Sequence, residues 1–245
     1  MPKLESSAII YRGPSELDGQ PIIVIVTGID GSSKNGKTGP MLQTWVLRSD
    51  IETHIAAKTG ADASICGACP LRWTESKGRA CYVRPSDAPL KVFRAARDGR
   101  YDDKTPAEVN RLANGRPIRV GSYGDPAAVP VSVWADLVGT GRATSYTHGW
   151  RTSPELRDLC MASVENEADA ATAQRAGWRT FRVQNPEDHG APLANEIECP
   201  ADTRGITCFD CGLCRGSLRA KNIVITGHGN GKKLIPIEQA AIACS

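Results

Sequence analysis

Residues 118–125 read IRVGSYGD, and they begin the most regular part of the chain. The apolar, β-branched residues of 118–123 predict a strand, and the segment 130–138, closed by Gly139, predicts a helix. The alternation continues, with strands expected at 143–148, 159–164, 178–184 and 223–226, and helices after the cap Ser153 and over 167–176. Repeated strand–helix units with short, right-handed connections imply a parallel sheet. The predicted fold class is therefore α/β, with a full or partial TIM-like (β/α) barrel.

The residues before this region predict an N-terminal β-hairpin extension of the barrel. Residues 21–27, PIIVIVT, form a continuous β-branched run typical of a strand, and residues 41–47 predict a second strand. Helices are expected over 49–59, 90–98 and 105–112. A single domain is expected for the 245 residues, with strands and a helix in 1–60 and a cysteine-bearing, barrel-like core in 61–245.

The loop between the two hairpin strands matches a phosphate-binding motif. Residues 31–38, GSSKNGKT, fit the P-loop pattern G-x4-G-K-T and follow a strand. A P-loop must open a helix whose N-terminal amides face the phosphates, but Gly39 and Pro40 follow here, and the next segment looks strand-like. A loop that joins two strands is the simpler interpretation. Nucleotide binding through Lys37 and Thr38 is kept as a distant alternative.

Three cysteines in the last fifth of the chain follow the spacing C-x2-C-x2-C. Cys208, Cys211 and Cys214 form this run, and Cys199 lies upstream of it. Each C-x2-C step lets two sulfurs of one tight turn reach the same metal centre, and thiolate-only ligation suits zinc or iron–sulfur. Because such a run is commoner around 4Fe-4S cubanes, an iron–sulfur cluster is favoured over zinc. The short run can hold only one side of a cubane, so the remaining ligand is expected from Cys199 or from an earlier cysteine.

Those earlier cysteines are Cys66, Cys69 and Cys81. The first two form a C-x2-C pair, and a polar, loop-like segment separates them from the third. Three thiols could bind three corners of a cubane and leave one iron open, or they could complete the later site. Unliganded cysteines are the alternative. Cys160 and Cys244 have no motif around them and are expected to be ordinary residues.

Polar residues gather where the expected strands end. Sites in such barrels are built at the C-terminal ends of the strands, so these residues are expected to form one polar mouth. Asp125, His148 and Glu165 are the candidate cofactor-binding residues, with Asp125 and His148 on neighbouring strands. No catalytic residue is predicted, because no nucleophile–base or acid–base set is recognisable. The other polar residues at these ends are Ser122, Tyr123, Thr147, Asn166, Gln184, Asn185, Thr226 and His228.

The composition argues against two classes of partner. The chain has 30 basic and 27 acidic residues and a net charge of +3, so neither nucleic acid nor a membrane surface is indicated. The sequence shows no signal peptide and no apolar run of membrane-spanning length. Nine cysteines in such a chain point to a reducing cytoplasm and to metal rather than to disulfides.

These motifs resemble those of the phage "gene product 88-like" proteins, a family found in tailed phages. The similarity rests on residues 118–125, a helix with Trp134, the YTH sequence of 146–148, and the cysteine elements of 66–81 and 199–214. It implies a phage-encoded iron–sulfur protein of the host cytoplasm, with a barrel-like fold distantly similar to radical-SAM cores and no known reaction. The radical-SAM motif C-x3-C-x2-C is absent, which counts against S-adenosylmethionine chemistry.

Two functions follow from these observations. The first is an iron–sulfur protein with a redox or electron-transfer role, which implies a redox partner protein. The second is a radical-SAM-like enzyme that uses S-adenosylmethionine. In that enzyme Cys66, Cys69 and Cys81 would hold a catalytic cluster, and the later cysteines would hold an auxiliary one.

Overall fold

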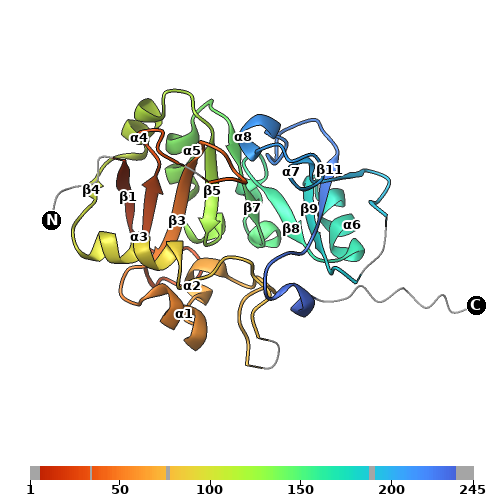
Figure 1. Ribbon diagram of the computed structural model, residues 1–245, viewed down its shortest axis with the longest axis horizontal. Helices are drawn as coiled ribbons and strands as arrows, with labels where there is room; N and C mark the ends of the chain where they lie inside the picture. Colours follow the sequence, from red (N-terminus) through yellow and green to blue (C-terminus); the bar gives the residue numbers. More distant parts are fainter. Residues whose placement is uncertain (1–5, 34, 76–77, 188–190, 236–245) are drawn as a thin grey trace, which may run out of the picture.

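Two mostly parallel β-sheets flanked by helices form the architecture of the computed structural model, which describes residues 6–33, 35–75, 78–187 and 191–235 (Figure 1). The six-stranded sheet contains, in spatial order, β4 (Asp102–Asp103), β1 (Ser7–Pro14), β2 (Pro21–Thr27), β3 (Leu42–Arg48), β5 (Ile118–Tyr123) and β6 (Ala143–Thr144). The five-stranded sheet contains β10 (Glu196–Glu198), β11 (Asn222–Thr226), β9 (Thr180–Gln184), β8 (Met161–Val164) and β7 (Tyr146–Thr147). The predicted α/β class is confirmed. The described strands form two sheets and no closed barrel.

An antiparallel meander builds the N-terminal half of the six-stranded sheet. β2 is β-branched and mostly buried, as suits a strand covered on both faces, and it pairs antiparallel with both β1 and β3. β3 then pairs parallel with β5, so the predicted hairpin is part of the sheet rather than an extension of it. Sequence patterns missed β1, because its apolar run is short and is followed directly by Arg12, Gly13 and Pro14.

The chain passes from one sheet to the other at a single residue. β6 ends at Thr144 and β7 begins at Tyr146, so the strand expected over 143–148 is divided at Ser145. The Ser145 amide donates to the Cys214 carbonyl (3.0 Å), and the Ser145 carbonyl accepts from the Met161 amide (3.0 Å). All pairs in the second sheet are parallel.

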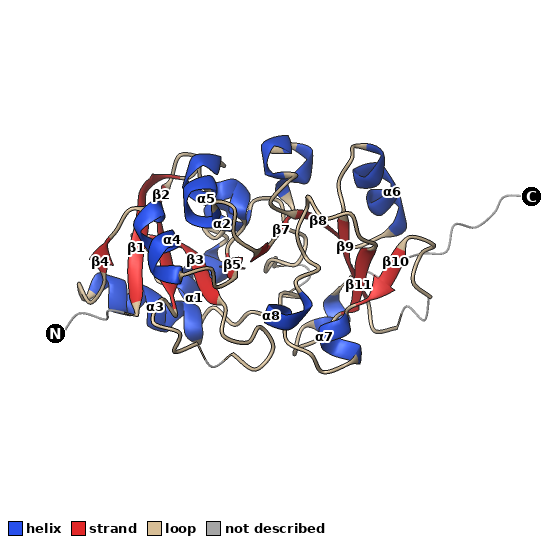
Figure 2. Ribbon diagram, turned by 90° about the horizontal axis from the view of Figure 1, so that it is seen from above, coloured by secondary structure: helices blue, strands red, loops and turns tan. Residues whose placement is uncertain are grey.

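The helices are α1 (Thr53–Thr59), α2 (Ala63–Cys66), α3 (Ala88–Arg97), α4 (Pro106–Ala113), α5 (Val131–Val138), α6 (Glu167–Arg175), α7 (Pro200–Thr203) and α8 (Cys208–Cys211). Local signals explain several ends; for example, Thr105 and Glu108 form a capping box at the start of α4. Figure 2 shows α5 and α6 on one side of the molecule and α7 and α8 on the opposite side. The helix expected after Ser153 is only a 3₁₀ turn, Pro154–Leu156, because the chain soon enters β8. No helix in the described ranges is long and apolar enough to cross a bilayer.

The apolar interior has two parts. The larger part includes the fully buried Trp134 and Leu42 of the six-stranded side and extends to Ala162 of β8 and Ala170 of α6. The smaller part belongs to the five-stranded sheet and contains Phe181 together with two motif cysteines, Cys199 and Cys214. Part of the cysteine motif is therefore built into the core rather than into an exposed loop.

A buried ion pair crosses the five-stranded sheet. Arg182 of β9 and Glu196 of β10 lie on either side of β11, and their Nη2 and Oε2 atoms are 2.8 Å apart. Glu196 also accepts a hydrogen bond from the Leu193 amide (3.0 Å). Buried charges need such pairing, so these contacts fix the short strand β10 at the edge of the sheet.

Candidate metal centre

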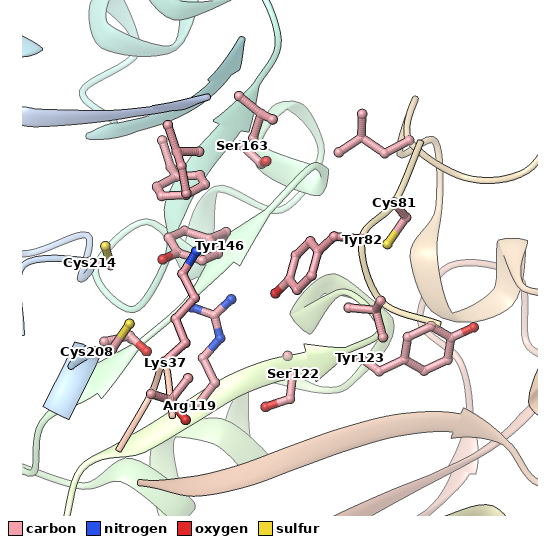
Figure 3. Close-up of a pocket in the computed structure, with 18 of the residues that line it drawn as sticks. Lys37, Cys81, Tyr82, Arg119, Ser122, Tyr123, Tyr146, Ser163, Cys208 and Cys214 are labelled. Atoms are coloured by element: carbon pink, nitrogen blue, oxygen red, sulfur yellow. The ribbon is translucent and has the colours of Figure 1, made fainter. Parts of the chain in front are cut away.

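A cavity of about 440 Å³ is lined by residues of both sheets (Figure 3). Alternate residues of the strands face it, because successive side chains of a strand point to opposite sides. They include Arg119, Gly121 and Tyr123 of β5, Tyr146 of β7, Ser163 of β8, Phe181 and Val183 of β9 and Ile225 of β11. All seven motif cysteines line the same cavity. The fold thus brings together two cysteine groups that lie far apart in the sequence.

The first thiol group consists of Cys66, Cys69 and Cys81. Cys66 ends α2, and Gly67 follows with φ of +55°, which turns the chain back toward the cavity. The Cys69 amide donates to the Cys66 carbonyl at 3.2 Å. Burial and the neighbouring Cys69 raise the pKa of the Cys66 thiol, and burial also raises the pKa of Cys81. Thiols in this setting become thiolates only when a cation compensates their charge.

Buried polar atoms around this group lack partners. Nε and Nη1 of Arg79 and the hydroxyl of Tyr123 have no hydrogen-bond partner within the described part of the chain. Arg72 binds one oxygen of the buried Asp62 (2.6 Å), whereas the other oxygen stays 3.5 Å from Arg79 Nη1. An unpaired buried donor costs about 1–3 kcal/mol. An anionic centre held by the thiols would accept hydrogen bonds from Arg79 and Tyr123, so the residues present fit an iron–sulfur cluster.

Asp125, His148 and Glu165 meet at the ends of β5, β7 and β8. The Asp125 carboxylate accepts from the His148 amide (2.7 Å) and from the Thr147 hydroxyl (2.6 Å). His148 Nε2 lies 2.7 Å from Glu165 Oε1, and the ring also hydrogen-bonds the Cys69 thiol. Burial lowers the pKa of His148, but Cys69 and Glu165 outweigh burial and raise it. Asp125 and His148 both line the cavity, but β5 and β7 belong to different sheets, so the expected placement on neighbouring strands is wrong.

The other polar residues expected at this mouth divide into two sets. Ser122, Tyr123 and His228 line the cavity. The rest serve local structure: Thr147 binds Asp125, Asn166 caps α6, Gln184 binds Thr226, and Asn185 donates to the Ile235 carbonyl. Polar residues at the predicted strand ends thus identify some of the residues that line the cavity, whereas others only stabilise local structure.

The second thiol group consists of Cys199, Cys208, Cys211 and Cys214. Cys199 follows β10 directly, while Cys208 and Cys211 lie at the two ends of the single turn α8. Gly212 ends this helix with φ of +62°, a left-handed conformation that favours glycine. The C-x2-C spacing thus places two thiols on one helical turn.

This second group lies beside the body of the strands rather than beyond their ends. The Cys214 thiol hydrogen-bonds Tyr146 at the start of β7, and Cys208 lies within electrostatic reach of Arg119 near the start of β5. Burial raises the pKa of Cys214 to about 12 and also raises the pKa of Cys208. The nearby Cys199 also raises the pKa of both thiols, so it lies with this group rather than with the first.

The glycine-rich loop that resembles a P-loop packs against α8. The carbonyls of Lys37 and Thr38 accept hydrogen bonds from the amides of Cys208 (3.0 Å) and Phe209 (3.1 Å), and Lys37 Nζ pairs with Asp202 of α7 (2.8 Å). The chain then enters β3, so the predicted strand after this loop is confirmed and no helix opens there. The loop therefore caps the cysteine helix instead of a phosphate.

The thiols surround the cavity without closing on one point. Among the described residues, no three His, Cys, Asp or Glu side chains are arranged to hold a single metal ion. A structural zinc ion needs four ligands about 2.3 Å away, whereas the irons of a cluster are separate and their ligands stand farther apart. Thiolate-only donors suit either a zinc ion or an iron–sulfur cluster. Cys244 lies outside the described residues.

No family model, curated protein or solved structure matches the chain.

Sequence patterns did not identify Arg119 and Arg79 as site residues. Arg119 occupies a cavity-facing position of β5, two residues before Gly121 and four before Tyr123. The sequence does contain a signal for Arg119, because it alternates with the inward-facing residues of the strand. Arg is rarely fully buried unless it is paired, so an inward-facing Arg indicates a partner or a ligand. Arg79 gave no such signal, since it lies in an irregular segment.

Proposed function

We propose that this chain is an iron–sulfur protein that binds a 4Fe-4S cluster through Cys199, Cys208, Cys211 and Cys214. The supporting observation is the gathering of all seven motif thiols around one cavity, with Cys199 beside the other three thiols of its group. Thiolate-only donors suit such a cluster. A redox or electron-transfer role with a partner protein, in the cytoplasm of a phage-infected host, is proposed with it on the resemblance to the phage family.

Anaerobic purification with iron, sulfide and zinc quantification tests this proposal. Iron and sulfide are expected in equal amounts, and Cys211→Ser is expected to lose one full cluster because a hydroxyl replaces a ligand thiolate. Cys160→Ser is the matched control: its thiol is buried, contacts the Ser145 hydroxyl (3.0 Å) and does not line the cavity. Zinc without iron, or full iron content in Cys211→Ser, would contradict the proposal.

A radical-SAM-like enzyme is the second candidate, and the cavity favours it. A protein that only carries electrons needs no cavity of about 440 Å³, whereas small-molecule sites have this size. Cys66, Cys69 and Cys81 would then hold a cluster with one iron open to the cavity, beside the unpaired donors of Arg79. An altered EPR signal of the reduced protein on adding S-adenosylmethionine, with release of 5′-deoxyadenosine, is expected for the enzyme. An unchanged EPR signal would contradict the enzyme and favour the electron-transfer role.

The two sheets are also proposed to act as one open, partial (β/α) barrel with the cavity as its interior. The single-residue junction at Ser145 and the inward alternation of the strands support this arrangement. A single domain is proposed with it, so limited proteolysis is expected to release no stable fragment that ends near residue 60.

A further inference from the structure

Arg119 is a buried cation without an anionic partner. Its residue is 7 % exposed, and its guanidinium lies 4.3 Å from the centre of the Tyr146 ring. No Asp or Glu of the described ranges forms an ion pair with Arg119, and its neighbours in the cavity include Tyr146, Tyr82 and the Cys208 thiol. A buried guanidinium is stable only when a nearby anion compensates it.

The surroundings of Arg119 are open on the cavity side. Figure 3 shows its side chain rising from β5 between the rings of Tyr146 and Tyr82. Lys37 also lines the cavity, but its ammonium already pairs with Asp202 at 2.8 Å. The hydroxyl of Thr144, another lining residue, is buried and has no hydrogen-bond partner among the described residues. The apolar part of the wall is formed by Trp45, Val83, Phe181, Val183 and Ile225.

We propose that this cavity binds a small organic monocarboxylate, whose carboxylate is held by Arg119 and whose apolar body packs against the wall. The planar guanidinium matches the two oxygens of a carboxylate and binds them as a fork. One uncommitted positive charge balances a monoanion, whereas a phosphate dianion would need a second cation, and Lys37 is engaged elsewhere. The volume of about 440 Å³ accommodates such a molecule.

A different role for Arg119 is to balance the charge of the second thiol group, because Cys208 is among the groups that act on it. Tyr146 and Tyr82 also lie beside Arg119 and line the open cavity, so a ligand in the cavity would lie next to the guanidinium. The two roles predict different results when Arg119 is replaced. Loss of carboxylate binding supports the ligand site, whereas an altered cluster potential with unchanged binding supports the counter-charge.

The test uses benzoate and benzamide, which have the same ring and differ in charge. The full chain, purified anaerobically, is titrated with each probe by ligand-observed NMR. Benzoate is expected to bind roughly tenfold tighter than benzamide or better, and Arg119→Gln is expected to reduce benzoate affinity to that of benzamide, as loss of charge-assisted hydrogen bonds predicts. Equal affinity of the two probes for the unmodified protein would overturn the proposal, and this comparison needs no variant.

Arg142→Gln is the matched control. Arg142 also lies over an aromatic ring, 5.6 Å from the centre of Phe209, but it does not line the cavity, so benzoate affinity is expected to stay unchanged. Circular dichroism checks the fold of each variant. If Arg119→Gln does not fold, Arg119→Lys keeps the charge and loses the fork, and an intermediate affinity is expected. Unchanged benzoate binding in the folded Arg119 variant would overturn the proposal.

This inference does not rest on the cluster. Iron content and benzoate affinity are separate measurements, so a chain without iron that still prefers benzoate would reject the cluster and retain the carboxylate site. A chain with full iron that does not distinguish the probes would do the reverse.

Discussion

The packing of α8 against the glycine-rich loop depends most directly on Gly39. Its φ is +70°, and a Cβ atom there would lie 2.9 Å from Thr207 Oγ1 and 3.1 Å from Phe209 Cβ. Gly39→Ala is therefore expected to lower the free energy of unfolding by roughly 1–3 kcal/mol, since it adds both backbone strain and overlap with α8. Thermal unfolding and iron per chain measure the effect, and both are expected to fall.

Gly36→Ala is the control in the same loop. A Cβ at Gly36 meets no atom within 4 Å, and its backbone is not in the left-handed region. The two alanine variants are expected to differ clearly in melting temperature. If they melt together, the contact between the loop and α8 has little energetic importance.

The cysteines show what spacing can and cannot reveal at this scale. The C-x2-C steps predicted which neighbouring thiols share a turn, and Cys208 and Cys211 do share one. Spacing could not reveal that Tyr146 would bond Cys214, or that the donors of Arg79 would stand unpaired beside the first group. Those neighbours depend on the register of distant strands, which no local pattern encodes.

At the scale of elements, β10 depends on one buried charge. Glu196→Gln is expected to destabilise the protein by about 3–5 kcal/mol, because it leaves the Arg182 guanidinium buried without its counter-charge. Glu198→Gln makes the same chemical change at an exposed position of the same strand and is expected to have little effect. Denaturant unfolding of the two variants measures the difference. Equal stabilities would show that the pair across β11 is not needed.

The elements that sequence patterns found are those with a local cause. β2 was predicted from its β-branched run, α4 from Pro106 at its first turn, and α6 from its Ala-rich segment. β10 was missed because its three residues include two glutamates, and Glu196 is buried only through its pairing with a residue of another strand. The division of the strand at Ser145 was also missed because it depends on a distant residue. The Ser145 amide donates its hydrogen bond to the carbonyl of Cys214.

At the scale of the whole molecule, repeated strand–helix units predicted the mixed class, but they could not predict how many sheets form. Sheet closure depends on contacts between the first and last strands, which a repeating pattern does not specify. Asp125 and His148 do lie together, but they follow strands of two different sheets and meet through the hydrogen bond from the His148 amide to the Asp125 carboxylate. The sequence did not predict where the second thiol group lies, because that position results from the packing of α8 on the loop around Lys37.

That packing sets an order of events during biosynthesis. The loop around Lys37 is synthesised long before Cys208 and Phe209, whose amides donate hydrogen bonds to its carbonyls. Closing a contact between such distant segments is slow and must follow the sheets that carry them. The later thiols thus acquire their final geometry only after both sheets have formed. Loading of the proposed cluster at that group is therefore expected to follow the folding of both sheets, and a chain that ends before residue 208 is expected to lack it.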